Sequence, residues 1–203
     1  ITLTDGRTIV PLEPARDHKA VGDGDKGPNT GGMGVITPVS VLPRIRTQIE
    51  SQIVFPTVHA MNRENRRFQG FLYAGLMLTA QGPRVLVFYY GIGAPETQPL
   101  LMRLKSDLLP LLLATAEGKL EQMEAPVWDD RVAVCVVACA AGYPGDIKKG
   151  TPIFGIDRVP QGPDLQVFHA GTAQKLGSDL VTAGGRVLAV TALGKDATAA
   201  RER

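Results

Sequence analysis

The sequence predicts a mixed α/β (α+β) fold with a mainly antiparallel sheet, followed by a smaller β-rich domain. Two apolar runs of strand length, 70–79 and 85–90, are joined by Gln81-Gly-Pro, which indicates a buried antiparallel pair. The other expected elements are helices over 43–62 and 100–120, and short strands near 131–140, 164–169 and 186–192.

The first elements follow from turn and helix signals. Residues 1–12 contain two β-rich runs around Asp5-Gly6, a dipeptide suited to a tight turn with positive φ, so they predict a hairpin. Ile45, Ile49 and Ile53 recur at helical spacing after Pro43, so the sequence predicts a helix over 43–62. Because proline lacks a backbone N–H, we expect Pro56 to end or kink this helix.

The later elements are indicated by the positions of leucine, proline and glycine. Residues 100–120 are leucine-rich and helical in pattern, with breaks expected near Pro99 and Pro110 and an end at Gly118. The polar stretch 121–130 follows and indicates a boundary between domains. Short strands and a helical tail over 195–203 complete the pattern.

Composition excludes several classes of protein. The 203 residues suffice for one large or two small domains. With 22 Lys and Arg against 20 Asp and Glu, the net charge of +2 favours neither nucleic acid nor a membrane surface as partner. No apolar stretch approaches the 18 residues of a membrane-spanning helix. Cys135 and Cys139 form neither a disulfide framework nor a zinc spacing, which fits a reducing, cytoplasmic location.

Residues 14–38 show no helical or strand period and collect six glycines, so we expect one long loop, and such loops are usually functional or disordered. Gly22-Asp-Gly24-Asp-Lys-Gly27 satisfies G-x-G-x-x-G, but no helix follows it, which argues against a dinucleotide site. Pro28 stands where a P-loop requires lysine, which excludes that motif too.

What remains is Asp17-His18-Lys19 and the glycine-rich run that ends at Gly34. Charged and amide side chains alternate there with glycines, which allow backbone N–H groups to approach an anion closely. From the residues alone, both a ligand-binding loop and a solvated surface loop remain open.

Seven motifs occur in the same order as in the second half of the phosphoribosylamine-glycine ligases, and the chain resembles this family. Its members, also called glycinamide ribonucleotide synthetases, are ATP-grasp enzymes. They are Pro14-Ala-Arg-Asp-His-Lys19, Gly24-Asp-Lys-Gly-Pro-Asn-Thr-Gly-Gly-Met-Gly34, Leu72-Tyr-Ala-Gly-Leu-Met-Leu-Thr79, Pro95-Glu-Thr-Gln98, Gly142-Tyr-Pro-Gly145, Phe168-His-Ala-Gly-Thr172 and Gly184-Gly-Arg-Val-Leu188. Seven motifs in the family's order are far more specific than any single glycine pattern.

The resemblance implies a division of the chain. Residues 1–120 would form the later part of an ATP-grasp domain, 121–130 a linker, and 131–203 an incomplete small C-terminal domain. The family's N-terminal domain and the rest of its ATP-grasp segment are expected upstream, so the other half of the same enzyme is an expected partner.

The resemblance also implies an activity in purine biosynthesis. Family members use ATP and magnesium to phosphorylate glycine, and the amine of 5-phosphoribosylamine then attacks the glycyl phosphate. The substrate-binding positions that the resemblance favours here are Asp17, His18, Lys19, Asn29, Thr30, Gly31, Gly32 and Glu96. Glu96 is equally compatible with capping the next helix. No catalytic residue is assigned.

The sequence departs from the family at its metal site. The family's strand reads Glu-Phe-Asn-x-Arg-Phe-Gly-Asp-Pro-Glu, in which Glu and Asn are the magnesium ligands. The ligand positions here hold Val87 and Tyr89, and the Arg and Asp positions hold Gly91 and Ala94. Alternate residues of a strand share one face, so we expect 87, 89 and 91 to lie together, without the oxygen ligands that magnesium requires. Ala20 also replaces a usual Arg.

Two functions therefore stay open from the sequence. The chain is expected to be part of a carbon-nitrogen ligase by descent that binds neither ATP nor magnesium productively. The alternative is a non-catalytic module that keeps the fold to bind a phosphoribosyl-type ligand or another chain.

Overall fold

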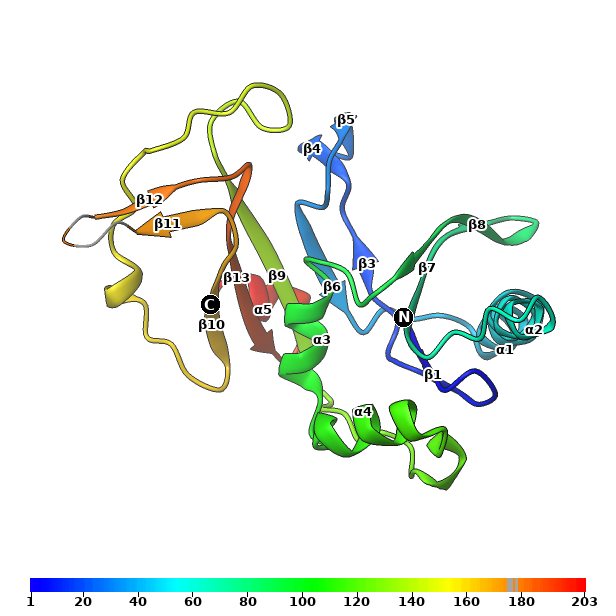
Figure 1. The fold of residues 1–203 in the computed structure, drawn as a ribbon. Helices are drawn as coiled ribbons and strands as arrows, with labels where there is room; N and C mark the ends of the chain where they lie inside the picture. Colours follow the sequence, from blue (N-terminus) through cyan, green and yellow to red (C-terminus); the bar gives the residue numbers. More distant parts are fainter. Residues whose placement is uncertain (175–176, 178) are drawn as a thin grey trace. The chain divides into compact units, whose positions relative to one another are not determined.

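The computed structural model describes residues 1–174, 177 and 179–203, and it consists of two compact units that are interleaved along the chain (Figure 1). The first unit contains residues 1–14, 39–93 and 104–128, and the second contains 15–38, 94–103 and 129–203. These units differ from the segments 1–120 and 131–203 expected from the sequence, and that domain division remains a prediction.

The first unit has an antiparallel sheet with the strand order β2-β1-β7-β8. Its strands are β1 (Thr2–Thr4), β2 (Ile9–Pro11), β7 (Gly70–Thr79) and β8 (Gly82–Tyr90). Both predicted hairpins are confirmed: Thr2 pairs with Pro11, and Leu72 pairs with Tyr90. Gly6 has a φ of +88° in the first turn, which glycine adopts without the strain a side chain would cause.

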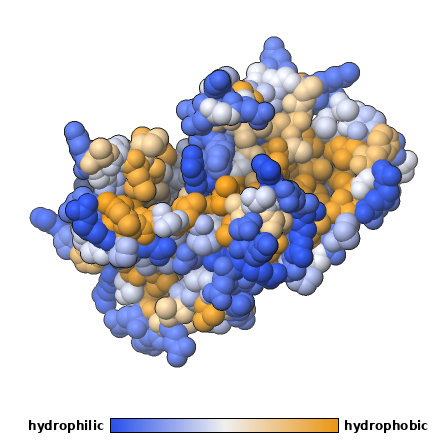
Figure 2. Space-filling view, turned by 180° about the vertical axis from the view of Figure 1, so that it is seen from behind, coloured by the Kyte–Doolittle hydropathy of each residue, from blue (hydrophilic) through white to orange (hydrophobic). Residues whose placement is uncertain are grey.

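The predicted burial of the second hairpin is wrong. The far part of β7 and most of β8 expose large apolar side chains, among them Met77, Leu86, Tyr89 and Tyr90. Figure 2 shows apolar residues gathered in patches on the surface rather than dispersed over it. Apolar content alone predicts strands here, but it does not predict which face of a strand is covered.

The helix expected over 43–62 is present in three parts. They are α1 (Pro43–Ile49), a π-helical turn over Glu50–Val54 and α2 (Phe55–Arg63). The irregularity therefore precedes Pro56, which lies in the first turn of α2, where its missing N–H is tolerated. Val54 and Val58 pack on Leu72 and Phe88, so this helical stretch covers one face of β7 and β8.

The helical segment expected over 100–120 is interrupted at 104–107, and not at Pro99 or Pro110, which both lie inside helices. It forms α3 (Thr97–Arg103), which belongs to the second unit, and α4 (Leu108–Glu117) in the first. Asp107 caps α4 by accepting a hydrogen bond from the Leu109 N–H at 2.9 Å. Gly118 ends α4 in the left-handed region, as predicted.

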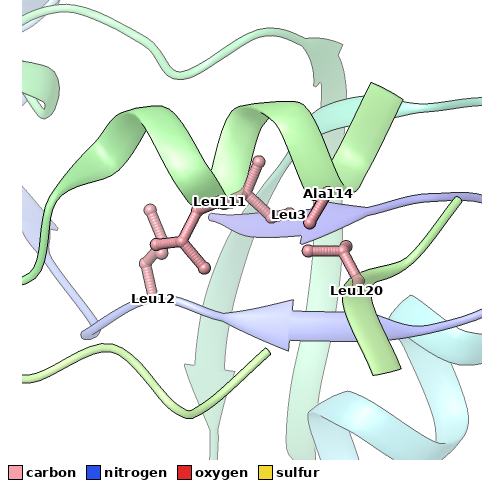
Figure 3. Packing of buried hydrophobic residues seen from close by; sticks show 5 residues of the cluster. All are labelled: Leu3, Leu12, Leu111, Ala114 and Leu120. Carbon is pink, nitrogen blue, oxygen red and sulfur yellow. The ribbon is translucent and has the colours of Figure 1, made fainter. Parts of the chain in front are cut away.

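Helix α4 and the short 3₁₀ helix Leu120–Gln122 close the main core of the first unit. Leu3, from the central strand β1, packs there with Leu111 and Leu120, as Figure 3 shows. This core holds β1 and β2 in place.

The second unit has an antiparallel sheet with the order β10-β13-β9-β6-β3. Its strands are β3 (Arg16–Asp17), β6 (Gly34–Thr37), β9 (Val132–Cys139), β10 (Leu165–His169) and β13 (Arg186–Gly194). The strands β9, β10 and β13 confirm the three short strands that the sequence predicts. Helices α3 and α5 (Ala197–Arg201) pack on β9 and β13, and Val35, Cys135 and Ala189 form a buried cluster.

The expectation of one long loop over 14–38 is wrong. Besides β3 and β6, this stretch contains the small hairpin of β4 (Ala20–Gly22) and β5 (Lys26–Asn29). The strands are short and glycine-rich, and β5 is exposed along its length, so no alternation of apolar residues marks them. A further pair, β11 (Thr172–Gln174) and β12 (Leu180–Thr182), was not predicted.

No helix among the described residues has the length and apolar character needed to cross a membrane.

Candidate functional site

Backbone pairing brings the two halves of the predicted substrate loop together. Asp17 pairs with Val35 across β3 and β6, and the pairing continues as His18 N–H donates to the Gly34 carbonyl at 2.9 Å. The Lys19 carbonyl accepts from the Thr30 N–H at 2.7 Å and from its hydroxyl at 2.9 Å. The segment 17–19 therefore lies along residues 28–34, which we call the glycine loop.

Asp17 is the buried anion of this site. Its side chain is 8% exposed, and neither carboxylate oxygen accepts a hydrogen bond within the described residues. The Lys19 ammonium, which is 44% exposed, forms an ion pair with Oδ2. This ion pair offsets only part of the cost of burying the carboxylate, and a ligand that carries N–H or O–H groups would add hydrogen bonds to its oxygens.

Gly32 places the glycine loop against this carboxylate. A Cβ atom at Gly32 would lie 2.8 Å from Asp17 Oδ1 and 2.6 Å from Cδ of Pro95. The φ of Gly32 is +114°, a conformation that residues with side chains rarely adopt. The close approach of the loop, Asp17 and Pro95 therefore requires glycine at position 32.

The remaining predicted substrate residues differ in exposure. His18 Nδ1 lies 3.3 Å from the Gly34 carbonyl oxygen and donates to it in the tautomer that carries the proton on Nδ1. Asn29 is exposed at the end of β5, opposite Ala20. Glu96 is buried directly after Pro95, and its carbonyl accepts the Leu100 N–H at 3.2 Å in the first turn of α3.

Two side chains that touch the glycine loop were not among the predicted site residues. The Tyr143 hydroxyl accepts a hydrogen bond from the Gly31 N–H at 3.0 Å, and Arg186 Nη1 donates to the Gly31 carbonyl at 2.6 Å. The signal was present, because both residues lie in motifs that carry the family resemblance, Gly142–Gly145 and Gly184–Leu188. Sequence alone gave no reason to place those motifs beside residue 31.

Val87 and Tyr89, at the positions where the family resemblance expects magnesium ligands, do not fit a magnesium ion. Val87 pairs with Gly75 and Tyr89 with Tyr73, so residues 87 and 89 share one strand face, as predicted. The Tyr89 ring packs on the Tyr73 ring with centroids 5.4 Å apart. Gly91 lies beyond the end of β8, so the expectation that it shares the strand with 87 and 89 is wrong.

Neither an isopropyl group nor a neutral phenol is a good ligand for a hard cation. Among the described residues, no group of three or more His, Cys, Asp or Glu side chains is arranged to hold a metal ion.

The two thiols are packing groups in the second unit. Cys135 is buried in the sheet and Cys139 is half-buried. Burial raises the pKa of both thiols, so neither has the lowered pKa of a reactive cysteine.

Comparison with known proteins identifies the fold class. A crystal structure of a phosphoribosylamine-glycine ligase from Thermotoga maritima superposes with a TM-score of 0.85 and 34% identity, covering 99% of this chain and 49% of that one. An L-amino acid ligase from Bacillus licheniformis is similar in fold alone, with a TM-score of 0.61 and 17% identity over 97% of this chain and 46% of that one. These neighbours and the antiparallel sheets define a chain of the ATP-grasp class.

Sequence comparison then gives the family. The model of the ATP-grasp (A) domain of phosphoribosylglycinamide synthetase matches residues 1–97, and that of the C domain of the same enzyme matches 133–203. The chain belongs to the phosphoribosylglycinamide synthetase family.

Curated relatives agree with this assignment. A phosphoribosylamine-glycine ligase from Rhodopirellula baltica is 51% identical over 99% of this chain and 46% of its own length. One from Agrobacterium fabrum is 48% identical over 99% of this chain and 47% of its own length. The chain thus spans about half the length of the curated relatives it matches.

Proposed function

We propose that this chain is the C-terminal part of a phosphoribosylamine-glycine ligase and that its glycine loop holds the substrate. By family, the whole enzyme would join glycine to 5-phosphoribosylamine through glycyl phosphate in the cytoplasm, with ATP as the phosphoryl donor, but in this chain we expect the residues at positions 87 and 89 to prevent productive binding of magnesium-ATP. The upstream half of the enzyme would complete the nucleotide site.

The observation that carries this proposal is the burial and incomplete hydrogen bonding of the Asp17 carboxylate. This buried carboxylate lies against the glycine loop, and among the described residues its partner is the half-exposed Lys19 ammonium at Oδ2, while Oδ1 accepts no hydrogen bond. Such a site suits a ligand that carries both an amine and an anionic group, because the carboxylate accepts from the amine while the Lys19 ammonium contacts the anion. Glycinamide ribonucleotide and its precursors have that combination.

A second candidate function is favoured by Val87 and Tyr89. Because these residues do not fit magnesium, the chain is also compatible with a module that binds a phosphoribosyl-type ligand without catalysis. Both candidate functions use the glycine loop to bind a ligand. They differ only in whether the protein uses ATP for catalysis.

Titration calorimetry with glycinamide ribonucleotide tests the shared claim. Lys19→Ala and Asn29→Ala should each weaken binding about tenfold or more, the effect of losing a charged or well-placed hydrogen bond, with little change in melting temperature. Lys119→Ala is the matched control, because the Lys119 ammonium also pairs with a nearby carboxylate, that of Glu117 at 2.7 Å. Unchanged affinity in both loop variants would identify the loop as ordinary solvated surface.

A further inference from the structure

Gly31 is held at both of its backbone polar groups by side chains from much later in the chain. Tyr143, 112 positions further on, accepts its N–H at 3.0 Å. Arg186, 155 positions further on, donates from Nη1 to its carbonyl at 2.6 Å. All three residues belong to the second unit.

The same guanidinium joins a second segment to the glycine loop. Arg186 Nη1 also donates to the Ala94 carbonyl at 2.6 Å, directly before Pro95 and the buried Glu96. A guanidinium is planar and rigid, so bonds to two carbonyls fix the two segments against each other. One side chain therefore connects two of the stretches that contain predicted substrate residues, the glycine loop and the segment before Glu96.

Glycines make room for the two side chains. A Cβ atom at Gly31 would lie 3.0 Å from the guanidinium carbon of Arg186. A Cβ atom at Gly185 would lie 2.4 Å from the ring of Tyr143. The Gly185 carbonyl accepts the Ala140 N–H at 2.8 Å, which ties the start of β13 to the turn that carries Tyr143.

We propose that Tyr143 and Arg186 are positioning residues, which hold the glycine loop in its substrate-binding conformation against the 94–96 segment. This inference rests on the proposed function of the loop. Gly31 and Gly32 give the loop large conformational freedom, and ordering it when ligand arrives would weaken binding. Two side chains that order the loop beforehand remove that cost.

Hydrogen exchange measures the loop directly. In the 203-residue chain, Tyr143→Phe and Arg186→Met should speed amide exchange in residues 28–34 at least about fivefold, because each removes an anchor of Gly31. Arg186→Lys should give an intermediate rate, since lysine keeps a donor but not the planar fork. Amides of β1 and β2 should not change. Arg84→Met is the control, because Arg84 is exposed and its guanidinium donates to the Gln81 side chain at 3.1 Å.

Affinity for glycinamide ribonucleotide separates positioning from stability. Arg186→Met should weaken binding about tenfold, and Arg186→Lys should keep part of the affinity that Arg186→Met loses. Melting temperatures should change little in these variants, because the hydrogen bonds to Gly31 are solvent-exposed. Unchanged exchange in both Tyr143→Phe and Arg186→Met would overturn the proposal. Faster exchange with unchanged affinity would overturn the positioning role. Absence of binding by the unsubstituted chain would contradict the proposed function, while the exchange rates would still decide whether these residues hold the loop.

Discussion

Gly32 and Asp17 approach so closely that a single added carbon atom at Gly32 would lie 2.8 Å from Asp17 Oδ1. This contact places the glycine loop over the buried carboxylate. The geometry of the predicted substrate site therefore depends on the absence of a side chain at position 32.

Gly32→Ala should displace the loop and weaken binding of glycinamide ribonucleotide about tenfold or more. The added methyl group meets Asp17 and Pro95 at contact distances that atoms do not tolerate, and alanine is strained at a φ of +114°. Calorimetry gives the affinity. Gly162→Ala is the control, because a Cβ atom there meets nothing within 4 Å. Equal affinities for Gly32→Ala and Gly162→Ala would show that the loop does not position the ligand.

Asp5 should make the stability of the first unit depend on pH. Its buried carboxylate accepts the N–H groups of Thr8, Arg7 and Leu120 at 2.8–3.1 Å. Burial raises the pKa of Asp5, but these hydrogen bonds together with the charge of Arg67 outweigh it, so the net pKa is lowered. Because the folded pKa lies below the unfolded one, the contribution to stability is complete above the unfolded pKa and is lost as pH falls through the folded pKa.

Asp5→Asn should therefore lower the free energy of unfolding by about 2 kcal/mol at pH 7, the scale of hydrogen bonds to a charged group. Urea unfolding at pH 7 and near pH 3 measures the difference, which should shrink at the lower pH because the unfolded chain then gains a proton on this carboxyl more readily than the folded protein does. Glu117→Gln, at an exposed ion pair, should change little at either pH. If Asp5→Asn lowers the free energy of unfolding equally at both pH values, the carboxylate charge does not contribute to stability.

The hairpins and the longer strands could be predicted because their signals are local. Asp5-Gly6 specifies a turn, and Gln81-Gly-Pro joins two apolar runs. The strands within 14–38 could not be predicted, because β4 and β5 are short, glycine-rich and exposed, and are held by backbone pairing with residues that carry no pattern. The π-helical turn before Pro56 likewise has no local sequence signal of the kind that proline supplies.

The candidate site was predictable in part. The resemblance supplied Asp17, Lys19 and the glycine loop, and the structure brings these residues together. Tyr143 and Arg186 were missed because their contacts with Gly31 span more than 100 residues, and no spacing rule connects such distant motifs. The exposure of β8 was missed for a similar reason, since a strand's composition does not say what covers it.

We propose that the family's magnesium-ATP chemistry is lost at Val87 and Tyr89. Removing a single charge-bearing contact from a preorganised site costs about 10²- to 10³-fold in rate, and several positions are changed here. The quadruple variant Val87→Glu, Tyr89→Asn, Gly91→Arg and Ala94→Asp restores the groups that the family pattern has. Joining the first half of the Rhodopirellula baltica relative to the chain, with and without these changes, supplies the upstream segment in both cases.

Calorimetric titration of ATP, with and without magnesium, is the most direct test. We expect no magnesium-dependent ATP binding by the chain alone or by the unsubstituted chimera, and we expect the quadruple variant of the chimera to bind ATP in a magnesium-dependent manner. Magnesium-dependent ATP binding by the chain with Val87 and Tyr89 in place would contradict the account.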